Sequence, residues 1–102
     1  MWILRTIDET EAEKTFRILT GAVRTVGRAT GADFIVDAPL VSRVHCRLTV
    51  LPDGDLEVRD LDSTNGTFVN GERINQHTLT DGDRVSFGSS EWVFKQVVFQ
   101  TA

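Results

Sequence analysis

Short runs of β-branched and aromatic residues recur along the chain at intervals of roughly 8–12 residues, and Gly, Asp, Asn or Pro separate them. Residues 45–50 alternate strictly: Cys46, Leu48 and Val50 share one face, while His45, Arg47 and Thr49 share the other. No stretch shows the helical period of about 3.6 residues. The pattern predicts an all-β sandwich or barrel with strands at 2–6, 15–19, 24–26, 34–36, 45–50, 56–60, 67–69, 73–74, 84–87 and 92–99.

Turn signals stand between the predicted strands. Tight turns are favoured at 52–54 (PDG), 70–71 (NG), 81–82 (DG) and 88–89 (GS). The polar stretch 75–78, which contains His77, is interpreted as a surface loop, and the acidic run 8–13 as a solvated hairpin loop. The strands at the two ends of the chain could pair and close the sandwich. The 102 residues contain no linker or internal repeat, so we expect one domain over residues 1–102.

Two Asn-Gly pairs lie only five residues apart, Asn65-Gly66 and Asn70-Gly71. Asn-Gly favours the type I′ turn of a hairpin, because both central residues of that turn need a positive φ. The second pair fits this role, since predicted strands flank it. The first lies in a stretch of Asp, Ser, Thr and Asn that is longer than a tight turn requires. Such side chains bind local backbone, but they can also hold a ligand anion.

Composition excludes several classes of function. The net charge of −4 argues against a general affinity for nucleic acid or anionic lipid. No apolar run approaches the length of a membrane span, and the first residues lack the pattern of a signal peptide, so we expect an intracellular protein. Cys46, His45 and His77 offer no spaced set of metal ligands, and we expect no metal or other cofactor. Nine of the 11 basic residues are Arg, which suits bidentate contacts with oxyanions.

Four blocks of polar and glycine residues stand at the predicted corners: Gly27-Arg28, then 42–45 (SRVH), then 63–71 (STNGTFVNG), then 79–88 (LTDGDRVSFG). In this order and at this spacing they resemble the signature of the forkhead-associated (FHA) domain family. The resemblance covers nearly the whole chain. It implies an eleven-strand β-sandwich that binds phosphothreonine peptides through loops at one end. The expected partner is then a phosphothreonine-containing protein, the product of a Ser/Thr kinase.

The resemblance also implies roles for individual residues. Arg28 would pair with the phosphate, and Ser42 and Arg43 would contact it from the next loop. Thr64 would contact the phosphothreonine, and Asn65 would hydrogen-bond the peptide main chain beside it. Four further residues would shape the site without reading the ligand: Gly27, His45, Gly66 and Asn70.

Other interpretations compete with this one. Ser42 lies three residues from His45, but no acidic residue is clearly placed to orient the His and no nucleophile elbow is present, so we do not expect an enzyme. Another alternative is a β-sandwich whose site is degenerate and which serves only in assembly. Such a domain would be expected to have lost Arg28, Ser42 or Asn65, and all three are present. The Cys46 thiol is expected to be buried and inert.

A weaker resemblance links the stretches 1–2, 16–21 and 26–28 to the N-terminal FHA domain of nibrin, a DNA-break-repair protein. FHA domains of bacterial Ser/Thr-kinase signalling fit the sequence equally well. The expected location is therefore cytoplasmic, or nuclear if the protein is eukaryotic and nibrin-like. We expect a monomer that binds neither nucleic acid nor membrane.

Overall fold

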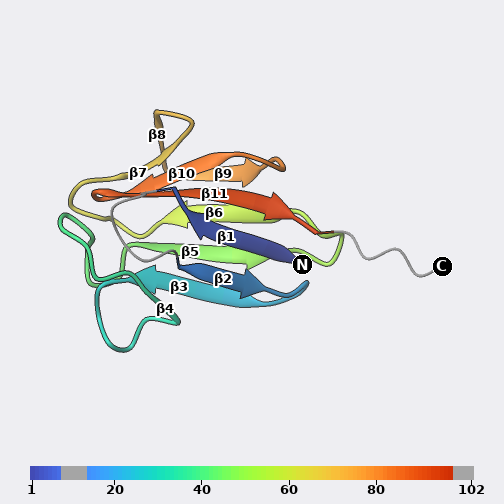
Figure 1. The fold of residues 1–102 in the computed structure, drawn as a ribbon, viewed down its shortest axis with the longest axis horizontal. Coiled ribbons are helices and arrows are strands. Elements are labelled where there is room, and N and C mark those ends of the chain that lie inside the picture. Colours follow the sequence, from blue (N-terminus) through green and yellow to red (C-terminus); the bar gives the residue numbers. More distant parts are fainter. Residues whose placement is uncertain (8–13, 98–102) are drawn as a thin grey trace.

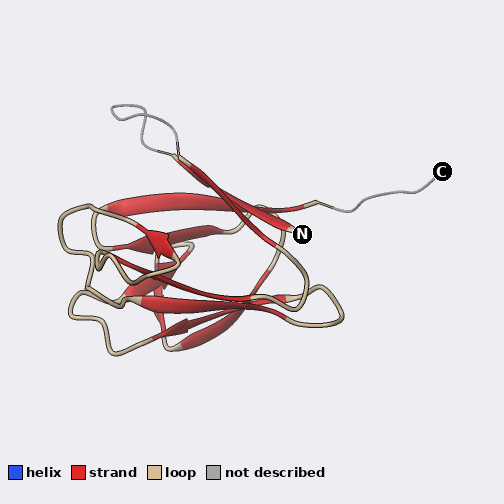
Figure 2. Ribbon diagram, turned by 90° about the horizontal axis from the view of Figure 1, so that it is seen from below, coloured by secondary structure: helices blue, strands red, loops and turns tan. Residues whose placement is uncertain are grey.

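The structure, a computed structural model, describes residues 1–7 and 14–97, which form two stacked β-sheets (Figure 1, Figure 2). One sheet has six strands in the order β2-β1-β11-β10-β7-β8, and the other has five in the order β4-β3-β5-β6-β9. The strands are β1 Trp2–Thr6, β2 Thr15–Ile18, β3 Val23–Gly27, β4 Phe34–Ile35, β5 Cys46–Val50, β6 Leu56–Asp60, β7 Thr67–Val69, β8 Glu72–Ile74, β9 Gln76–Leu79, β10 Arg84–Phe87 and β11 Ser90–Gln96.

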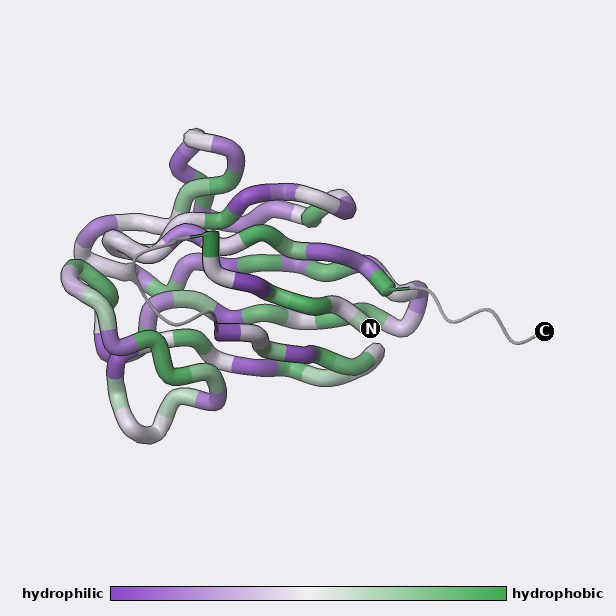
Figure 3. Tube along the Cα trace, in the orientation of Figure 1, coloured by the Kyte–Doolittle hydropathy of each residue, from purple (hydrophilic) through white to green (hydrophobic). Residues whose placement is uncertain are grey.

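The alternation in the sequence produces the core. In β5 and β6 every second side chain is buried against the opposite sheet, and the intervening ones face outward. Figure 3 shows hydrophobic and hydrophilic positions alternating along the strands. Between the sheets lies one cluster whose largest members are Trp2, Trp92, Phe87 and Phe94. The all-β sandwich predicted from the pattern is therefore confirmed.

Most strand predictions hold to within one residue, but one element was missed. Residues 76–78 were predicted as part of a loop, and they instead belong to β9, which pairs antiparallel with β6. His77 lies opposite Val58 in that pairing and is exposed, as expected of a surface residue. β9 is an edge strand with a partner on one side only, so three of its four residues are exposed and carry no alternation.

The two ends of the chain pair as predicted. β1 runs antiparallel to β11, from Trp2 opposite Gln96 to Thr6 opposite Trp92, and this places β11 in the middle of the six-stranded sheet. The last strand was predicted to reach residue 99; β11 ends at Gln96, and residues 98–102 lie outside the described residues, as does the acidic run 8–13. No described segment forms a helix that is long and apolar enough to cross a membrane.

The two Asn-Gly pairs differ in their backbone. Asn70 has φ 50° and Gly71 has φ 86°, which is the double positive φ of a type I′ turn between β7 and β8. At the first pair only Gly66 has a positive φ, of 88°. Asn65-Gly66 is therefore not a hairpin turn, and its loop between β6 and β7 lies at the end of the sandwich where the pocket opens.

Candidate functional site

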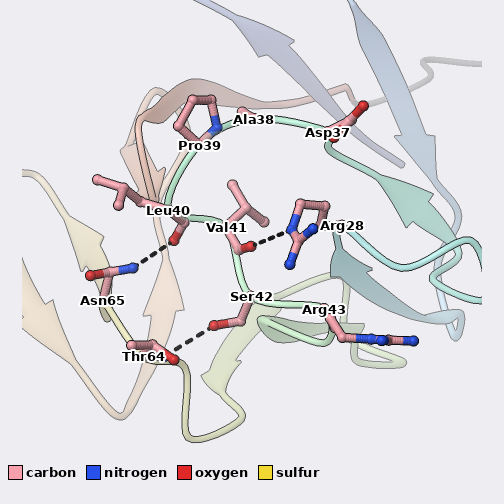
Figure 4. Close-up of a pocket in the computed structure, with 10 residues that line it drawn as sticks. All are labelled: Arg28, Asp37, Ala38, Pro39, Leu40, Val41, Ser42, Arg43, Thr64 and Asn65. Atoms are coloured by element: carbon pink, nitrogen blue, oxygen red, sulfur yellow. Dashed lines mark hydrogen bonds between the residues drawn. The ribbon is translucent and has the colours of Figure 1, made fainter.

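A pocket with a volume of about 640 Å³ opens among the loops at one end of the sandwich. Three segments supply its walls: the residue after β3, the loop between β4 and β5, and the loop between β6 and β7. Figure 4 shows the ten lining residues: Arg28, Asp37, Ala38, Pro39, Leu40, Val41, Ser42, Arg43, Thr64 and Asn65. The five residues expected to bind phosphothreonine are all among them.

Arg28 supplies a partly anchored guanidinium. Its backbone N–H donates to the Ser42 carbonyl at 3.0 Å, and its side-chain Nε donates to the Val41 carbonyl at 3.2 Å. Among the described residues nothing accepts a hydrogen bond from its two terminal nitrogens. Anchoring one donor reduces the freedom that this long side chain would lose when the others bind an anion.

Ser42 joins the two loops and still has a proton to donate. Its Oγ accepts a hydrogen bond from the backbone N–H of Thr64 at 3.0 Å. Among the described residues no group accepts a hydrogen bond from this hydroxyl, so its hydrogen is available to a ligand. The arrangement brings Ser42 and the exposed Thr64 side by side at one edge of the pocket (Figure 4).

Asn65 bridges to the other side of the pocket. Its Nδ2 donates to the Leu40 carbonyl at 3.0 Å. This bond leaves the side-chain carbonyl oxygen to accept a further hydrogen bond, such as one from a peptide N–H. The β6–β7 loop is thus tied to the β4–β5 loop at two points, Thr64 to Ser42 and Asn65 to Leu40.

Arg43 lines the pocket, but its side chain extends away from Ser42 and Thr64 (Figure 4). Its carbonyl accepts a hydrogen bond from the Ala29 N–H at 3.1 Å. The same carbonyl oxygen would stand 2.1 Å from a β-carbon at Gly27, so only glycine lets the strand and the loop approach this closely. Gly27 therefore sets the position of the 42–43 backbone.

His45 is fully buried beneath the loops, so its predicted place on the outer face with Arg47 and Thr49 was wrong. The strand β5 begins only at Cys46, and His45 belongs to the preceding loop. Its Nδ1 accepts from the Ser42 N–H at 3.1 Å, so Nδ1 carries no proton. The ring proton is then on Nε2, which lies 2.9 Å from the Gly66 carbonyl and donates to it. One imidazole thereby links the β4–β5 loop to the β6–β7 loop. The Ser42 hydroxyl takes no part in this contact, so Ser42 and His45 do not form a nucleophile–base pair.

Asn70 lies outside the pocket. Its side-chain oxygen accepts from the Arg84 N–H, and its Nδ2 donates to Asp83 Oδ1, both at 3.0 Å. It joins the turn after β7 to the segment before β10. The structure therefore places Asn70 apart from the other residues expected to shape the site.

Asp60 was not identified from the sequence, although its carboxylate anchors the β6–β7 loop. Asp60 Oδ1 accepts from the Ser63 hydroxyl at 2.6 Å and from the Thr67 hydroxyl at 2.8 Å, and Ser63 Oγ in turn accepts from the Gly66 N–H at 2.9 Å. The spacing of an Asp three residues before a Ser is a local turn signal that could have indicated it. No cluster of His, Cys, Asp or Glu able to hold a metal occurs within residues 1–7 and 14–97.

Comparison with known proteins assigns the family. The sequence model of the FHA domain matches residues 24–88. The chain belongs to the forkhead-associated domain family. A solved FHA domain from a study of phosphothreonine-dependent FHA interactions superposes with a TM-score of 0.81 at 28% identity, covering 96% of this chain and 98% of that one. FHA domains are recognition modules for phosphothreonine and not enzymes, and this FHA domain is a phosphopeptide-binding module.

Two curated bacterial proteins contain a segment similar in sequence to this chain. The chain is 47% identical over 74 residues to an ABC transporter ATP-binding/permease protein of Mycobacterium tuberculosis, which covers 72% of the chain and 8% of the transporter. It is 39% identical over 77 residues to the oxoglutarate dehydrogenase inhibitor of Corynebacterium diphtheriae, covering 76% of the chain and 53% of the inhibitor. The chain thus spans about half the length of one relative and a small part of the other.

Proposed function

We propose that the pocket at residues 28, 42–43 and 64–65 is the phosphothreonine site. The observation that carries this is the convergence of two unused donor groups from different loops, the terminal nitrogens of Arg28 and the hydroxyl of Ser42, in one pocket. In this proposal Arg28 and Ser42 bind the phosphate. Thr64 contacts the phosphothreonine, and Asn65 holds the peptide main chain.

Charge supports the assignment. A phosphothreonine carries roughly −1.5 to −2 charges and three strong acceptor oxygens at neutral pH. The described residues contain no helix whose N-terminus could neutralise it, so side chains and loop amides have to supply the positive potential. Arg43 would add to it if its exposed side chain turned inward. Hydrogen bonds to charged groups contribute about 1.5–3 kcal/mol each. Three or four of them, less the cost of ordering the peptide, agree with affinities around micromolar, near −8 kcal/mol.

The biological setting is also a proposal. The relatives named above are bacterial, which supports a role in bacterial Ser/Thr-kinase signalling and a cytoplasmic location. They give no support to the nuclear, nibrin-like alternative. We propose that the partner is a protein phosphorylated on threonine. The monomeric state remains a prediction. The lack of affinity for nucleic acid and membrane remains a prediction from charge and composition.

Titration with a degenerate peptide library tests the proposal. Three versions of the library differ only in the central residue, which is phosphothreonine, phosphoserine or unphosphorylated threonine. We expect micromolar binding of the first and none of the third. Phosphoserine should bind about 10- to 200-fold more weakly, because it lacks the methyl that would pack between the Ser42 and Thr64 loops. Equal, negligible binding of all three forms would instead favour a degenerate domain kept for assembly.

A further inference from the structure

Arg73 is a cation beside the peptide-holding loop that the phosphothreonine site does not use. It lies in β8, directly opposite Phe68 of β7, on the outer face of the six-stranded sheet. A β-carbon at Gly66 would stand 2.8 Å from Arg73 Nε and 3.2 Å from its Cζ. The guanidinium therefore lies against the α-carbon of Gly66, the residue that follows Asn65.

This contact is independent of the bonds that build the pocket. The Gly66 carbonyl is bound by His45, and the Gly66 N–H by Ser63, so both backbone groups of this glycine are fixed. Arg73 covers the remaining side, where the lack of a side chain leaves room for it. The guanidinium of Arg73 thus lies beside the loop that presents Thr64 and Asn65.

The donors of Arg73 are unused. Within the part of the chain that the structure describes, no hydrogen bond or ion pair engages its guanidinium, and the residue is exposed. Its acidic sequence neighbour Glu72 and the loop residue Asp62 make no ion pair with it. The N–H donors of the guanidinium are therefore available to a ligand.

We propose that Arg73 is a specificity-determining residue that binds an acidic side chain of the phosphopeptide, a carboxylate or a second phosphate, displaced along the chain from the phosphothreonine. The proposal rests on the assignment of the pocket as the phosphothreonine site. If Asn65 holds the peptide main chain, the side chain of an adjoining peptide residue can reach the long Arg73 side chain, which lies beside the next residue of the loop. The planar fork of donors suits both kinds of oxyanion.

The test compares peptides that carry a single charged residue at different distances from the phosphothreonine. The probe is a neutral peptide with a central phosphothreonine and a single Asp, Lys or phosphoserine placed in turn at each of the five positions on either side. Binding is measured by fluorescence anisotropy for the wild type, for Arg73→Glu and for Arg17→Glu. Arg17 is an exposed strand residue of the same sheet that does not line the pocket, so it is the matched control for charge reversal.

For the wild type we expect Asp at one position, or two adjacent ones, to tighten binding about 2- to 5-fold over Lys, the range of an exposed ion pair. Phosphoserine there should tighten it further, and the preference should shrink as salt is raised. In Arg73→Glu the same position should prefer Lys, while Arg17→Glu should behave as the wild type. Such an inversion cannot come from a merely structural role of Arg73 at Gly66.

The possible failures can be told apart. A wild type that binds the phosphothreonine peptide but shows no acid preference, or a preference that survives Arg73→Glu, overturns the role of Arg73 and leaves the phosphothreonine site intact. A wild type that binds no phosphothreonine peptide overturns the proposed function itself. If Arg73→Glu lowers the melting temperature, Arg73→Gln provides the comparison, and the acid preference should then disappear without inverting.

Discussion

Arg28 reaches the pocket with one nitrogen already committed, since its Nε donates to the Val41 carbonyl. The bond fixes the plane of the guanidinium before a ligand arrives, and the Ser42 and Asn65 side chains are likewise held by one bond each. Each of the three keeps a second donor or acceptor free. At the scale of single residues, the site is pre-organised, and binding spends little entropy on ordering it.

Replacing Arg28 by Ala should weaken phosphothreonine binding and leave the fold intact. The loss of one partner of a hydrogen-bonded charge pair costs about 2–5 kcal/mol, which is 30-fold or more in affinity. Calorimetric titration measures this, with a thermal melt as the check on folding. Arg28 would be removed from the site if the variant kept both its affinity and its melting temperature.

Variants of His45 should separate its two hydrogen bonds. His45→Ala leaves the Ser42 N–H and the Gly66 carbonyl without partners, and each buried unpaired group costs about 1–3 kcal/mol. We expect a clearly lower melting temperature for this variant. His45→Asn can still accept from Ser42, and His45→Gln can still donate to Gly66, so each should recover part of the loss. Asn should preserve phosphopeptide binding better, because Ser42 is proposed to contact the phosphate. An unchanged melting temperature in His45→Ala contradicts the linking role.

The site residues that could be identified from the sequence are polar or charged residues in loops between strands, at positions where folding alone does not require them. Arg28, Ser42 and Asn65 belong to this class. Asp60 and Arg73 do not, because their importance depends on which backbone the strands bring beside them. Asp60 lies at the end of an ordinary strand, and Arg73 reads as a solvated strand residue until the register places it against Gly66.

At the scale of elements, alternation and turn residues were sufficient for most strands. They failed for β9, whose neighbour on one side is solvent. They also could not reveal the shape of the β4–β5 loop, where Leu40 has φ 70°. A β-carbon at Gly88 would stand 2.5 Å from the Leu40 carbonyl carbon, and the Ser89 N–H donates to the Pro39 carbonyl at 3.0 Å. Contacts from the β10–β11 turn therefore hold a backbone conformation that a Leu rarely adopts.

Leu40 should set the preference for the third residue after the phosphothreonine. Its side chain is 62% exposed at the rim of the pocket, and an apolar rim cannot compensate the desolvation of a carboxylate. We expect an aliphatic residue to be favoured over Asp there by about 5-fold, the effect of burying roughly half an aliphatic side chain. Peptide arrays with a fixed phosphothreonine measure it.

Leu40→Gly should abolish this preference without disturbing the loop, because glycine adopts φ 70° freely. The same change at Leu19, which is 63% exposed and outside the pocket, is the control and should leave selectivity unchanged. Enrichment of Asp or Glu at the third position would refute the role of Leu40 and direct attention to Arg43 or Arg47.

At the scale of the whole molecule, the loop that builds the site continues directly into a strand of the core. Cys46 follows His45 directly, begins β5 and is fully buried between the sheets, as predicted from the alternation. Burial raises the pKa of its thiol far above the usual value. The native state therefore keeps the proton that the unfolded state releases above about pH 8.5, and stability should decline as pH rises from there.

Cys46 is the only cysteine in the chain, so its alkylation reports the opening of this strand alone. The thiol has to leave the core to ionise, and at pH 7 labelling should be slow in the native protein. A ligand that binds only the folded state stabilises it by about 2.7 kcal/mol at 100 times its Kd. If Cys46 is exposed only by global unfolding, a phosphothreonine peptide at that concentration should slow labelling about 100-fold, and its unphosphorylated form should not slow it at all. In Arg28→Ala the same protection should need a proportionally higher concentration. Labelling that is rapid, or that saturating peptide leaves unchanged, would mean that β5 opens locally without disturbing the loops, and that His45 does not couple the site to the core.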